Sequence, residues 1–323
     1  MPKTIPTTGR TALVTGSSRG LGLLIASELA ARGCRVMLCG RNELALARAA
    51  AGLRGLPGAV ATTHCDLTSD EAPARLLAGV RNHFGAEVDL LVNNAGLIQV
   101  GPLTALNEQD FRAAYELMAL APLRLVQAVL PGMLARGSGS IVTIGSIGGR
   151  IAVPHLLPYS TAKFAAVGLS EGLAAELAPT GVRVTTVIPG LMRTGSHNGA
   201  EFAGQPGKEY AWFATGASLP LVSTDARRAA RRIVRAVEHG RREVVLTPLA
   251  KAGVLAHGLA PAATGRALAL AARLLPPAGE APTARRSGAE AARNYREGGV
   301  LHRLTALGDR AAHRNNEPTA QWR

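Results

Sequence analysis

Tyr159 and Lys163 are the two side chains of this sequence best placed to move a proton together. They stand four residues apart, and the apolar residues that follow recur at helical spacing, so both lie on one face of a predicted helix. A phenol with a pKa of about 10 is a poor proton donor or acceptor at neutral pH. An ammonium one turn away favours the phenolate and lowers that pKa. Bringing it to about 7 requires about 4 kcal/mol, of which Lys163 would supply part.

Ser146 can bring a hydroxyl to the same place. It follows an apolar strand predicted over Ile141–Ile144, thirteen residues before Tyr159. A neutral hydroxyl donates a hydrogen bond to a carbonyl oxygen that gains negative charge during a reaction. The spacing Tyr-x-x-x-Lys also arises by chance on surface helices. The three residues therefore indicate catalysis only if the rest of the chain supplies a cofactor site.

A glycine-rich turn near the N-terminus has the composition of a phosphate cradle. The predicted strand Thr11–Thr15 leads into Gly16–Gly22 (GSSRGLG), and a predicted helix follows and stops at Gly33. Glycines let the backbone approach a pyrophosphate, and free N–H groups at the helix N-terminus face it. The spacing Gly-x-x-x-Gly-x-Gly differs from the commonest dinucleotide motif, Gly-x-Gly-x-x-Gly. A purely structural tight turn is the alternative.

The residues after the second predicted strand indicate which nicotinamide cofactor the chain would take. Gly40 and Arg41 follow the strand Arg35–Cys39, where an acidic side chain would bind the adenosine ribose and repel a 2′-phosphate. Arg41 would instead pair with a 2′-phosphate, and Arg19 is a second candidate. A solvated arginine at a helix start is the alternative. The two arginines predict NADP(H) in preference to NAD(H).

Small or polar residues also follow later predicted strands, at the sheet edge where open α/β sheets bind ligands. Asp66 follows the strand 59–65 and could contact an adenine or cap the helix predicted over 69–84. The strand 88–92 ends in Asn93–Gly96, whose small residues suit a backbone that passes close to a ligand. Beyond the strand 183–188, residues 191–222 contain apolar and aromatic residues without clean periodicity, which predicts a mobile substrate lid.

Strands and helices alternate along residues 1–248, which predicts an α/β domain with a parallel sheet and helices on both faces. The helical stretch 110–135 should kink at Pro122. Residues 249–323 read as an extension. We expect a helical hairpin broken near Pro261 and, from Pro282 onward, a flexible and poorly ordered basic tail.

Positive charge is concentrated in the last third of the chain. Residues 224–323 hold 18 Lys or Arg and 8 Asp or Glu, which is +10 of the total +14. Such a surface can bind anionic lipid, nucleic acid or an acidic partner, or can reflect GC-rich coding alone. Aromatic residues are not interleaved with the charges, which argues against nucleic acid. A basic amphipathic helix can lie on an anionic membrane, but we favour packing against its own domain or a sister subunit.

The three cysteines have neither the pairing pattern of a disulfide framework nor the spacing of a zinc site, so we expect a reducing compartment and no metal. Residues 1–10 lack the apolar segment of a secretion signal, and no run of 18 uncharged apolar residues predicts a membrane span. These observations favour a cytoplasmic protein.

Taken together, the motifs resemble the short-chain dehydrogenase/reductase family from about Gly9 to Thr247, about three quarters of the chain. The resemblance implies a Rossmann-type, doubly wound sheet of about seven strands with a nicotinamide cofactor across the strand ends. The implied cofactor-binding residues are Thr15, Gly16, Ser17, Ser18, Arg19, Gly20, Leu21, Gly22, Arg41, Asp66, Leu67, Asn93, Ala95, Gly96, Tyr159, Lys163, Pro189, Gly190 and Thr194.

The resemblance also implies roles for the catalytic residues. Tyr159 would be the acid/base, Ser146 would orient the substrate oxygen, and Lys163 would hold the ribose and lower the tyrosine pKa. Thr194 would hold the nicotinamide carboxamide. Family members form dimers or tetramers through helices that here span 110–135 and 159–178.

One position departs from the family pattern. Family members often carry an asparagine in the middle of the helix that here spans 110–135, where it anchors a water that links the lysine to solvent. Met118 stands at that position, and a thioether accepts hydrogen bonds only weakly. Two hypotheses follow. The chain is an NADP-dependent oxidoreductase for a hydrophobic ketone, aldehyde or alcohol, or it is a catalytically weak nucleotide-sensing or membrane-surface binding protein.

Overall fold

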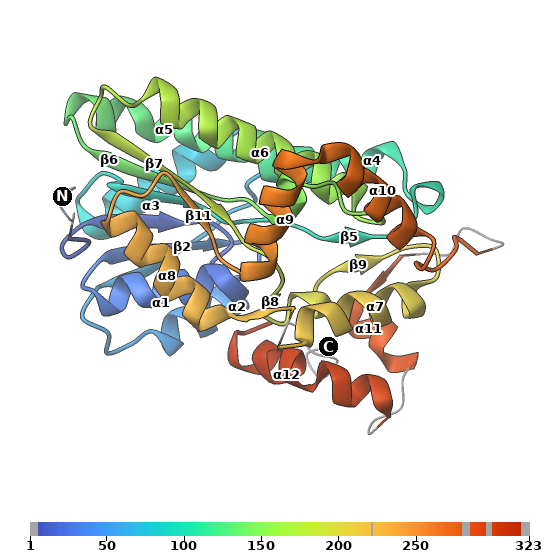
Figure 1. Ribbon diagram of the computed structural model, residues 1–323. Coiled ribbons are helices and arrows are strands. Elements are labelled where there is room, and N and C mark those ends of the chain that lie inside the picture. The colour runs from blue at the N-terminus through green and yellow to red at the C-terminus, as the bar shows by residue number, and fades with distance from the viewer. Residues whose placement is uncertain (1–5, 221, 280–284, 295–298, 318–323) are drawn as a thin grey trace.

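Seven parallel strands form the central sheet of the computed structural model, which describes residues 6–220, 222–279, 285–294 and 299–317 (Figure 1). Their order is β11-β7-β6-β4-β1-β2-β3. The strands are β1 (Thr11–Val14), β2 (Arg35–Gly40), β3 (Val60–His64), β4 (Leu90–Asn93), β6 (Gly139–Ile144), β7 (Val182–Ile188) and β11 (Glu243–Val245). The strand order reverses between β1 and β4, and such a reversal opens a ligand-binding crevice at the carboxyl ends of the strands. The predicted doubly wound fold is confirmed.

Helices cover both faces of this sheet, and each face has its own apolar core. On one face lie α1 (Gly20–Ala31), α2 (Glu43–Gly52) and α8 (Ala226–Glu238); on the other lie α3 (Ala72–Phe84), α5 (Ala121–Ala135) and α6 (Leu157–Glu176). Alternate residues of a strand point to opposite faces. Ala12 and Val14 of β1 therefore join the first core, while Leu13 joins the second.

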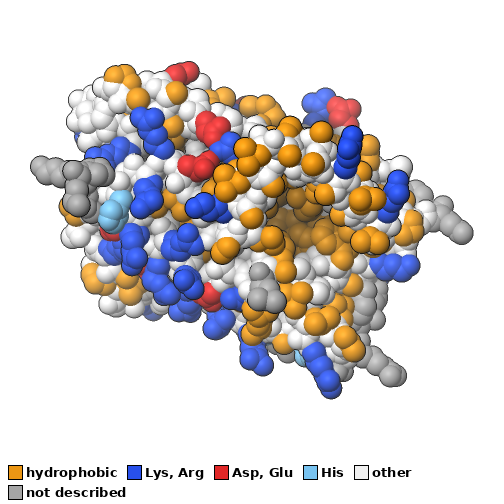
Figure 2. Space-filling model, viewed as in Figure 1, with side chains coloured by type: hydrophobic (Ala, Val, Ile, Leu, Met, Phe, Trp, Pro, Cys, Tyr) orange, Lys and Arg blue, Asp and Glu red, His pale blue; other side chains and the backbone are white. Residues whose placement is uncertain are grey.

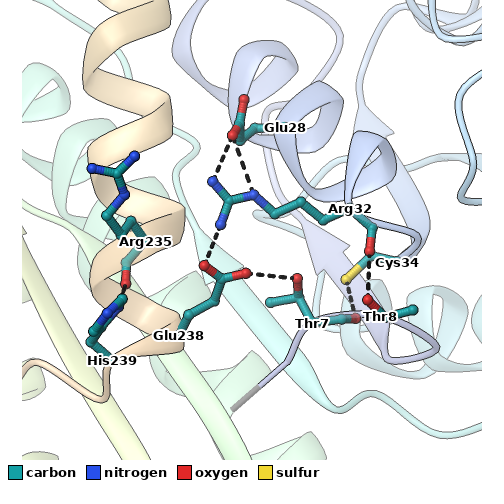
Figure 3. A network of polar contacts seen from close by, with 8 residues as sticks. All are labelled: Thr7, Thr8, Glu28, Arg32, Cys34, Arg235, Glu238 and His239. Atoms are coloured by element: carbon teal, nitrogen blue, oxygen red, sulfur yellow. Dashed lines mark hydrogen bonds and ion pairs between the residues drawn. The ribbon is translucent and has the colours of Figure 1, made fainter. Parts of the chain in front are cut away.

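A polar network joins α1 to α8 at the edge of the first core (Figure 3). Arg32, just after α1, forms ion pairs with Glu28 at 2.7 Å and with Glu238 of α8. Glu238 also accepts a hydrogen bond from Thr7 Oγ1 at 3.2 Å. The predicted basic helix thus buries its small and aliphatic face against the core and uses one carboxylate to tie the N-terminal segment to α1.

The long helical stretch before β6 is interrupted one turn earlier than Pro122. It consists of α4 (Glu108–Tyr115), a π-helical segment η2 (Glu116–Leu120) and α5. Pro122 has no N–H for the carbonyl of Met118, and its ring crowds that carbonyl, which widens the preceding turn. By length and composition Glu108–Ala135 could cross a membrane, but half of its most apolar window is buried and it packs as a core helix of this fold.

Short elements build a second layer beyond the carboxyl ends of the sheet. They include η1 (Leu103–Ala105), β5 (Gln99–Val100), η3 (Ile147–Gly149), β8 (Met192–Arg193), η4 (Ser196–Asn198), β9 (Glu201–Phe202), α7 (Pro206–Ser218), β10 (Thr224–Asp225), β12 (Arg286–Ser287), α11 (Gly288–Ala291) and η5 (Ala292–Asn294). Strand β9 pairs with β5 and β12, and the fully buried Phe202 centres a third apolar cluster. The stretch predicted as a lid therefore contains a well-formed helix.

The C-terminal extension forms the predicted hairpin of helices, α9 (Pro248–Leu259) and α10 (Pro261–Ala272), with the break at Ala260. The expectation of a poorly ordered tail from Pro282 is wrong for the described residues after it. Helix α12 (Val300–Arg314) lies along α7, where Gly308 contacts Ser218 and His197 (Figure 1). Small residues on α12 allow this close packing, although the segment has few large apolar side chains.

Candidate active site

Ser146 and Tyr159 meet at the carboxyl end of the sheet. Ser146 follows β6, and Tyr159 lies in the first turn of α6. A Cβ on Gly148 would lie 3.5 Å from Ser146 Oγ and 3.3 Å from Tyr159 Cε1, so the two side chains flank the same glycine, and the Ser146 hydroxyl acts to lower the pKa of the Tyr159 phenol. The Gly148 N–H donates to Ser146 Oγ at 3.0 Å, which leaves the serine proton free to point at the phenol. Sequence reasoning brought these two residues together, and the structure places them in contact.

The expected lowering of the Tyr159 pKa is wrong for this structure. Burial raises the pKa of the Tyr159 phenol, and the hydrogen bond from Ser146 offsets only part of that effect. The Lys163 ammonium lies 5.7 Å from the centroid of the tyrosine ring, and it donates to the Ile144 carbonyl at 2.7 Å. Spacing on a helix could not reveal that competing carbonyl. Tyr159 is therefore a neutral phenol here, ready to donate a proton.

Lys163 is itself buried, with 5% of its surface exposed. Burial lowers the pKa of its ammonium to about 8. A methyl group added to Gly96 would lie 3.2 Å from Met118 Sδ and 3.9 Å from Lys163 Nζ, so these two side chains flank the same glycine. Met118 is buried in the π-helical segment. The position that carries asparagine in many family members thus presents a sulfur beside the lysine.

The glycine-rich loop is shaped by contacts that only glycine permits. Gly16 and Gly20 adopt left-handed φ angles of 61° and 58°. A Cβ on Gly22 would lie 2.5 Å from Asn94 Nδ2 and 3.0 Å from the Gly16 carbonyl carbon. Asn94 Nδ2 donates to the carbonyl oxygens of Thr15 and Gly16 at 2.9 and 3.2 Å. The loops after β1 and β4 are therefore locked together at the crevice.

Buried polar groups in this region fit a bound nucleotide. Thr15 Oγ1 accepts from the N–H groups of Asn94 and Ala95 at 2.9 and 3.1 Å, and the buried Ser17 hydroxyl donates to the Val14 carbonyl at 2.7 Å. Both polar atoms of the buried Asn93 amide lack a hydrogen-bond partner among the described residues. A buried amide without a hydrogen-bond partner lowers the stability of the fold, because the amide has lost its hydrogen bonds to water. A ligand that enters the crevice beside Asn93 could satisfy it.

The two residues predicted for the adenosine end differ in their surroundings. Arg41 is exposed, as a residue that binds a phosphate from solvent would be. Asp66 Oδ1 accepts from the Thr68 N–H at 3.0 Å and from the Thr68 hydroxyl at 2.8 Å, and chiefly for this reason the pKa of the Asp66 carboxyl is lowered. These bonds form a turn before α3, whose N-cap is Glu71, so Asp66 does not cap that helix as the alternative to adenine contact predicted. Its neighbour Leu67 is buried in the second core.

At the other end of the crevice, the loop after β7 approaches η3. The Ile147 N–H donates to the Pro189 carbonyl at 2.7 Å, and Gly190 lies against Thr247. Thr194 is buried and its Oγ1 accepts from the Ser196 N–H at 3.1 Å. The predicted residues of the nicotinamide end are therefore held close to the loop that carries Ser146.

Sequence reasoning missed a buried carboxylate, Glu209, that contacts the turn between Ser146 and Tyr159. Glu209 of α7 is fully buried and is bonded to His155 Nδ1 at 2.9 Å and to Trp212 Nε1 at 2.7 Å. The bond to His155 ties α7 to the turn just before α6, and the bond from Trp212 lies within α7. A hollow lined by hydrophobic side chains lies between α7 and the α9–α10 hairpin (Figure 2). Tyr159 packs at the margin of the third apolar cluster, whose members include Leu156 and Phe213.

Sequence reasoning also missed the segment Asn315–Glu317, which contacts the glycine-rich loop from the far end of the chain. Asn315 O accepts from the Gly20 N–H at 2.8 Å, and Glu317 forms an ion pair with Arg19 at 3.3 Å. Nothing in the spacing of residues signals a contact between segments some 300 positions apart.

Comparison with known proteins gives one consistent family. Residues 10–201 match the short chain dehydrogenase family. An uncharacterized oxidoreductase of Staphylococcus saprophyticus is 38% identical over 186 residues, 57% of this chain and 79% of that protein. A crystal structure of a short-chain dehydrogenase from Streptomyces avermitilis is 32% identical with a TM-score of 0.68, and covers 82% of this chain and 99% of its own. L-sorbose reductase from Gluconobacter frateurii, solved with NADPH and L-sorbose, is 25% identical with a TM-score of 0.64, over 76% of this chain and 97% of its own.

Proposed function

This chain belongs to the short-chain dehydrogenase family of oxidoreductases, and from that premise we propose that it interconverts a ketone or aldehyde and the corresponding alcohol with NADP(H). The observation that carries the proposal is the placement of Ser146 and Tyr159 on either side of Gly148 at the strand ends, with the Lys163 ammonium 5.7 Å from the centre of the tyrosine ring. A chance surface pair would be neither buried nor joined to a serine from another element.

The three side chains divide the proton chemistry of carbonyl reduction among them. The nicotinamide cofactor supplies the hydride when bound. The Tyr159 hydroxyl donates its proton to the substrate oxygen, and Ser146 donates a hydrogen bond that steadies the charge developing there. Lys163 carries a positive charge below its pKa of about 8, and it would stabilise the tyrosinate left behind once its ammonium turns from the Ile144 carbonyl toward the phenolate. In alcohol oxidation the same groups accept the proton.

The preference for NADP(H) rests on Arg41, which is exposed after β2, and on the absence of an acidic side chain at positions 40 and 41. Thr15–Gly22 and Asn93–Gly96 would hold the pyrophosphate and the ribose, and Thr194 the carboxamide. An arginine matches a 2′-phosphate with a bidentate pair of hydrogen bonds, which NADH cannot use.

A hydrophobic substrate fits the apolar surroundings of Tyr159. The third apolar cluster includes Leu156, with the partly buried Val153 and Trp212 packed against it. Hydrophobic side chains also line the hollow between α7 and the α9–α10 hairpin (Figure 2). The exposed Phe164 on α6 and Leu134 on α5 support assembly into a homodimer or homotetramer through these helices.

The test is reduction of a panel of ketones and aldehydes, followed by NADPH or NADH absorbance, with the wild type and Arg41→Ala. We expect turnover with NADPH, and in the variant a roughly 10- to 100-fold loss of NADPH affinity with NADH affinity unchanged, because one charged pair is worth about 1.5–3 kcal/mol. Equal losses for both nucleotides would overturn the assignment of Arg41. No turnover with any carbonyl compound would overturn the proposed reaction.

A second candidate function, binding at a membrane surface, is favoured by one observation. Leu255, Leu259, Leu270 and Leu274 of the α9–α10 hairpin and the turn after it are exposed beside basic residues. Sedimentation with anionic liposomes tests it: binding that is lost when these leucines become serine supports the second function, and a protein that stays in the supernatant eliminates it.

A further inference from the structure

The segment Asn315–Glu317 occupies the place at which the glycine-rich loop is built to receive an anion. Gly20 is the first residue of α1, and its N–H is one of the unpaired donors that make a helix N-terminus bind phosphate. This N–H donates to the Asn315 carbonyl at 2.8 Å. A Cβ on Gly20 would lie 2.5 Å from Glu317 Oε1. A carboxylate of the chain itself therefore sits against the loop where we expect a pyrophosphate.

The same segment also contacts residues at the two ends of the predicted cofactor site. Asn316 Nδ2 donates to the carbonyl oxygens of Ser18 at 2.6 Å and of Ala45 in α2 at 3.1 Å, on the adenosine side. Asn315 Nδ2 donates to the Thr194 carbonyl at 3.0 Å, on the nicotinamide side. The segment thus bridges both ends of the crevice, as an extended dinucleotide would.

The contact between Glu317 and the glycine-rich loop is buried and charge-paired, unlike an incidental surface contact. Glu317 is 4% exposed, and its carboxylate pairs with Arg19 at 3.3 Å. Burial raises the pKa of the Glu317 carboxyl, while the charges of Arg19 and His197 act in the opposite direction. A buried carboxylate is retained only where partners compensate for its lost hydration. Here the partner is Arg19 of the phosphate loop, with the charge of His197 acting in the same direction.

Helix α12 anchors this segment to the substrate side of the molecule. His197 Nε2 bonds to Asp309 Oδ1 at 3.1 Å, and Gly195 contacts Ala312. Gly195 directly follows Thr194 in the chain, and His197 is the third residue after it. If Asn315–Glu317 leaves the crevice, α12 and the loop after Thr194 that contacts it are therefore expected to move as well.

A pyrophosphate and Glu317 cannot share the N-terminus of α1. Both are anions, and both would pair with Arg19 beside Gly20, whose N–H is already taken by the Asn315 carbonyl. Like charges in one site also disfavour each other. We propose that Asn315–Glu317 is an intrachain ligand of the nucleotide site, which must leave for NADP(H) or NAD(H) to bind and so lowers the affinity for both. The inference rests on the proposed function, because it takes the nucleotide to be the competing ligand.

The decisive experiment compares full-length wild type with Glu317→Gln and Asn316→Ala by calorimetric titration with NADPH and with NADH. The apparent dissociation constant rises as the fraction of chains with an open site falls. We expect Glu317→Gln to tighten both nucleotides at least fivefold and by similar factors. Glu171→Gln is the charge-matched control, because Glu171 pairs with Arg150 on the far side of α6 and should leave both constants unchanged.

Hydrogen exchange of the wild type supplies an independent readout that needs no variant. Saturating NADPH should raise exchange across residues 300–317 while it lowers exchange in residues 15–22. Unchanged affinities in both variants, or a C-terminal segment that stays protected when NADPH is bound, would overturn the proposal and leave the proposed function intact. If Glu317→Gln binds NADPH tightly and the wild type does not, both the proposed function and the intrachain ligand are supported. Failure of every variant to bind either nucleotide would sink both proposals together.

Discussion

Substitution of Gly22 by alanine tests the nucleotide cradle through a single methyl group. The added Cβ would lie 2.5 Å from Asn94 Nδ2 and 3.0 Å from the Gly16 carbonyl carbon, and closer still to the Gly16 oxygen. Ordinary contacts of this kind are about 3.4 Å or longer, so the loop must move by close to 1 Å. No flexible side-chain tip can absorb this movement, because the nearest obstacle is backbone.

The expected magnitude follows from two costs. Overpacking of a well-packed site destabilises a protein by about 1–3 kcal/mol. A loop displaced by about 1 Å also misaims its N–H groups, and the loss of one hydrogen bond to a charged phosphate is worth about 1.5–3 kcal/mol. We therefore expect Gly22→Ala to weaken NADPH binding roughly 10- to 100-fold and to lower the unfolding temperature.

Calorimetric titration with NADPH and thermal unfolding measure these two effects separately. Gly52→Ala is the matched control, because a Cβ on this helical residue meets nothing within 4 Å. Alanine in place of glycine should there stabilise the fold by up to about 1 kcal/mol and leave NADPH binding unchanged. If Gly22→Ala binds NADPH within threefold of the wild type, the crevice beside Gly22 does not hold the pyrophosphate.

Two pH-dependent effects follow from buried charges. Burial places the pKa of Lys163 at about 8, so its positive charge is lost as pH rises through 8; carbonyl reduction should decline over that range, and Lys163→Arg, which stays charged, should abolish the decline in a kcat/KM–pH profile. Burial alone would raise the pKa of Asp309, but hydrogen bonds from His197 and Thr305 lower it below its usual value. Its stabilising contribution is therefore present above about pH 4 and lost as pH falls below that. Asp309→Asn should lower the unfolding temperature at pH 7 and flatten its acid dependence between pH 3 and 5; an unchanged melting curve would contradict this pairing.

The central sheet was predictable because most of its strands are short runs rich in apolar or β-branched residues, separated from the next strand by a helical pattern. The same signal placed Ser146, Tyr159 and the glycine-rich loop at one edge, since parallel strands all end on the same side. Two-residue strands such as β9 and β12 carry no periodicity, so the small sheets beyond that edge were not predictable. Their pairing joins Phe202 to Arg286, which no local pattern records.

Burial and long-range contacts account for the other departures. The Tyr159 pKa depends on how deeply the phenol is buried and on the Ile144 carbonyl that draws Lys163 away, and spacing reports neither. Helix α12 was expected to be poorly ordered because it has few large apolar residues. It is held instead by close contacts of glycine and alanine and by one ion pair, which composition does not distinguish from a solvated tail.

The claim that Tyr159 transfers the proton is tested most directly by Tyr159→Phe, assayed with the carbonyl compound that the wild type reduces fastest. Phenylalanine keeps the ring packing and removes only the hydroxyl that meets Ser146. We predict a fall in kcat of roughly 10²- to 10⁴-fold, the usual contribution of a general acid, with NADPH affinity within twofold of the wild type. A kcat within threefold of the wild type would contradict the account.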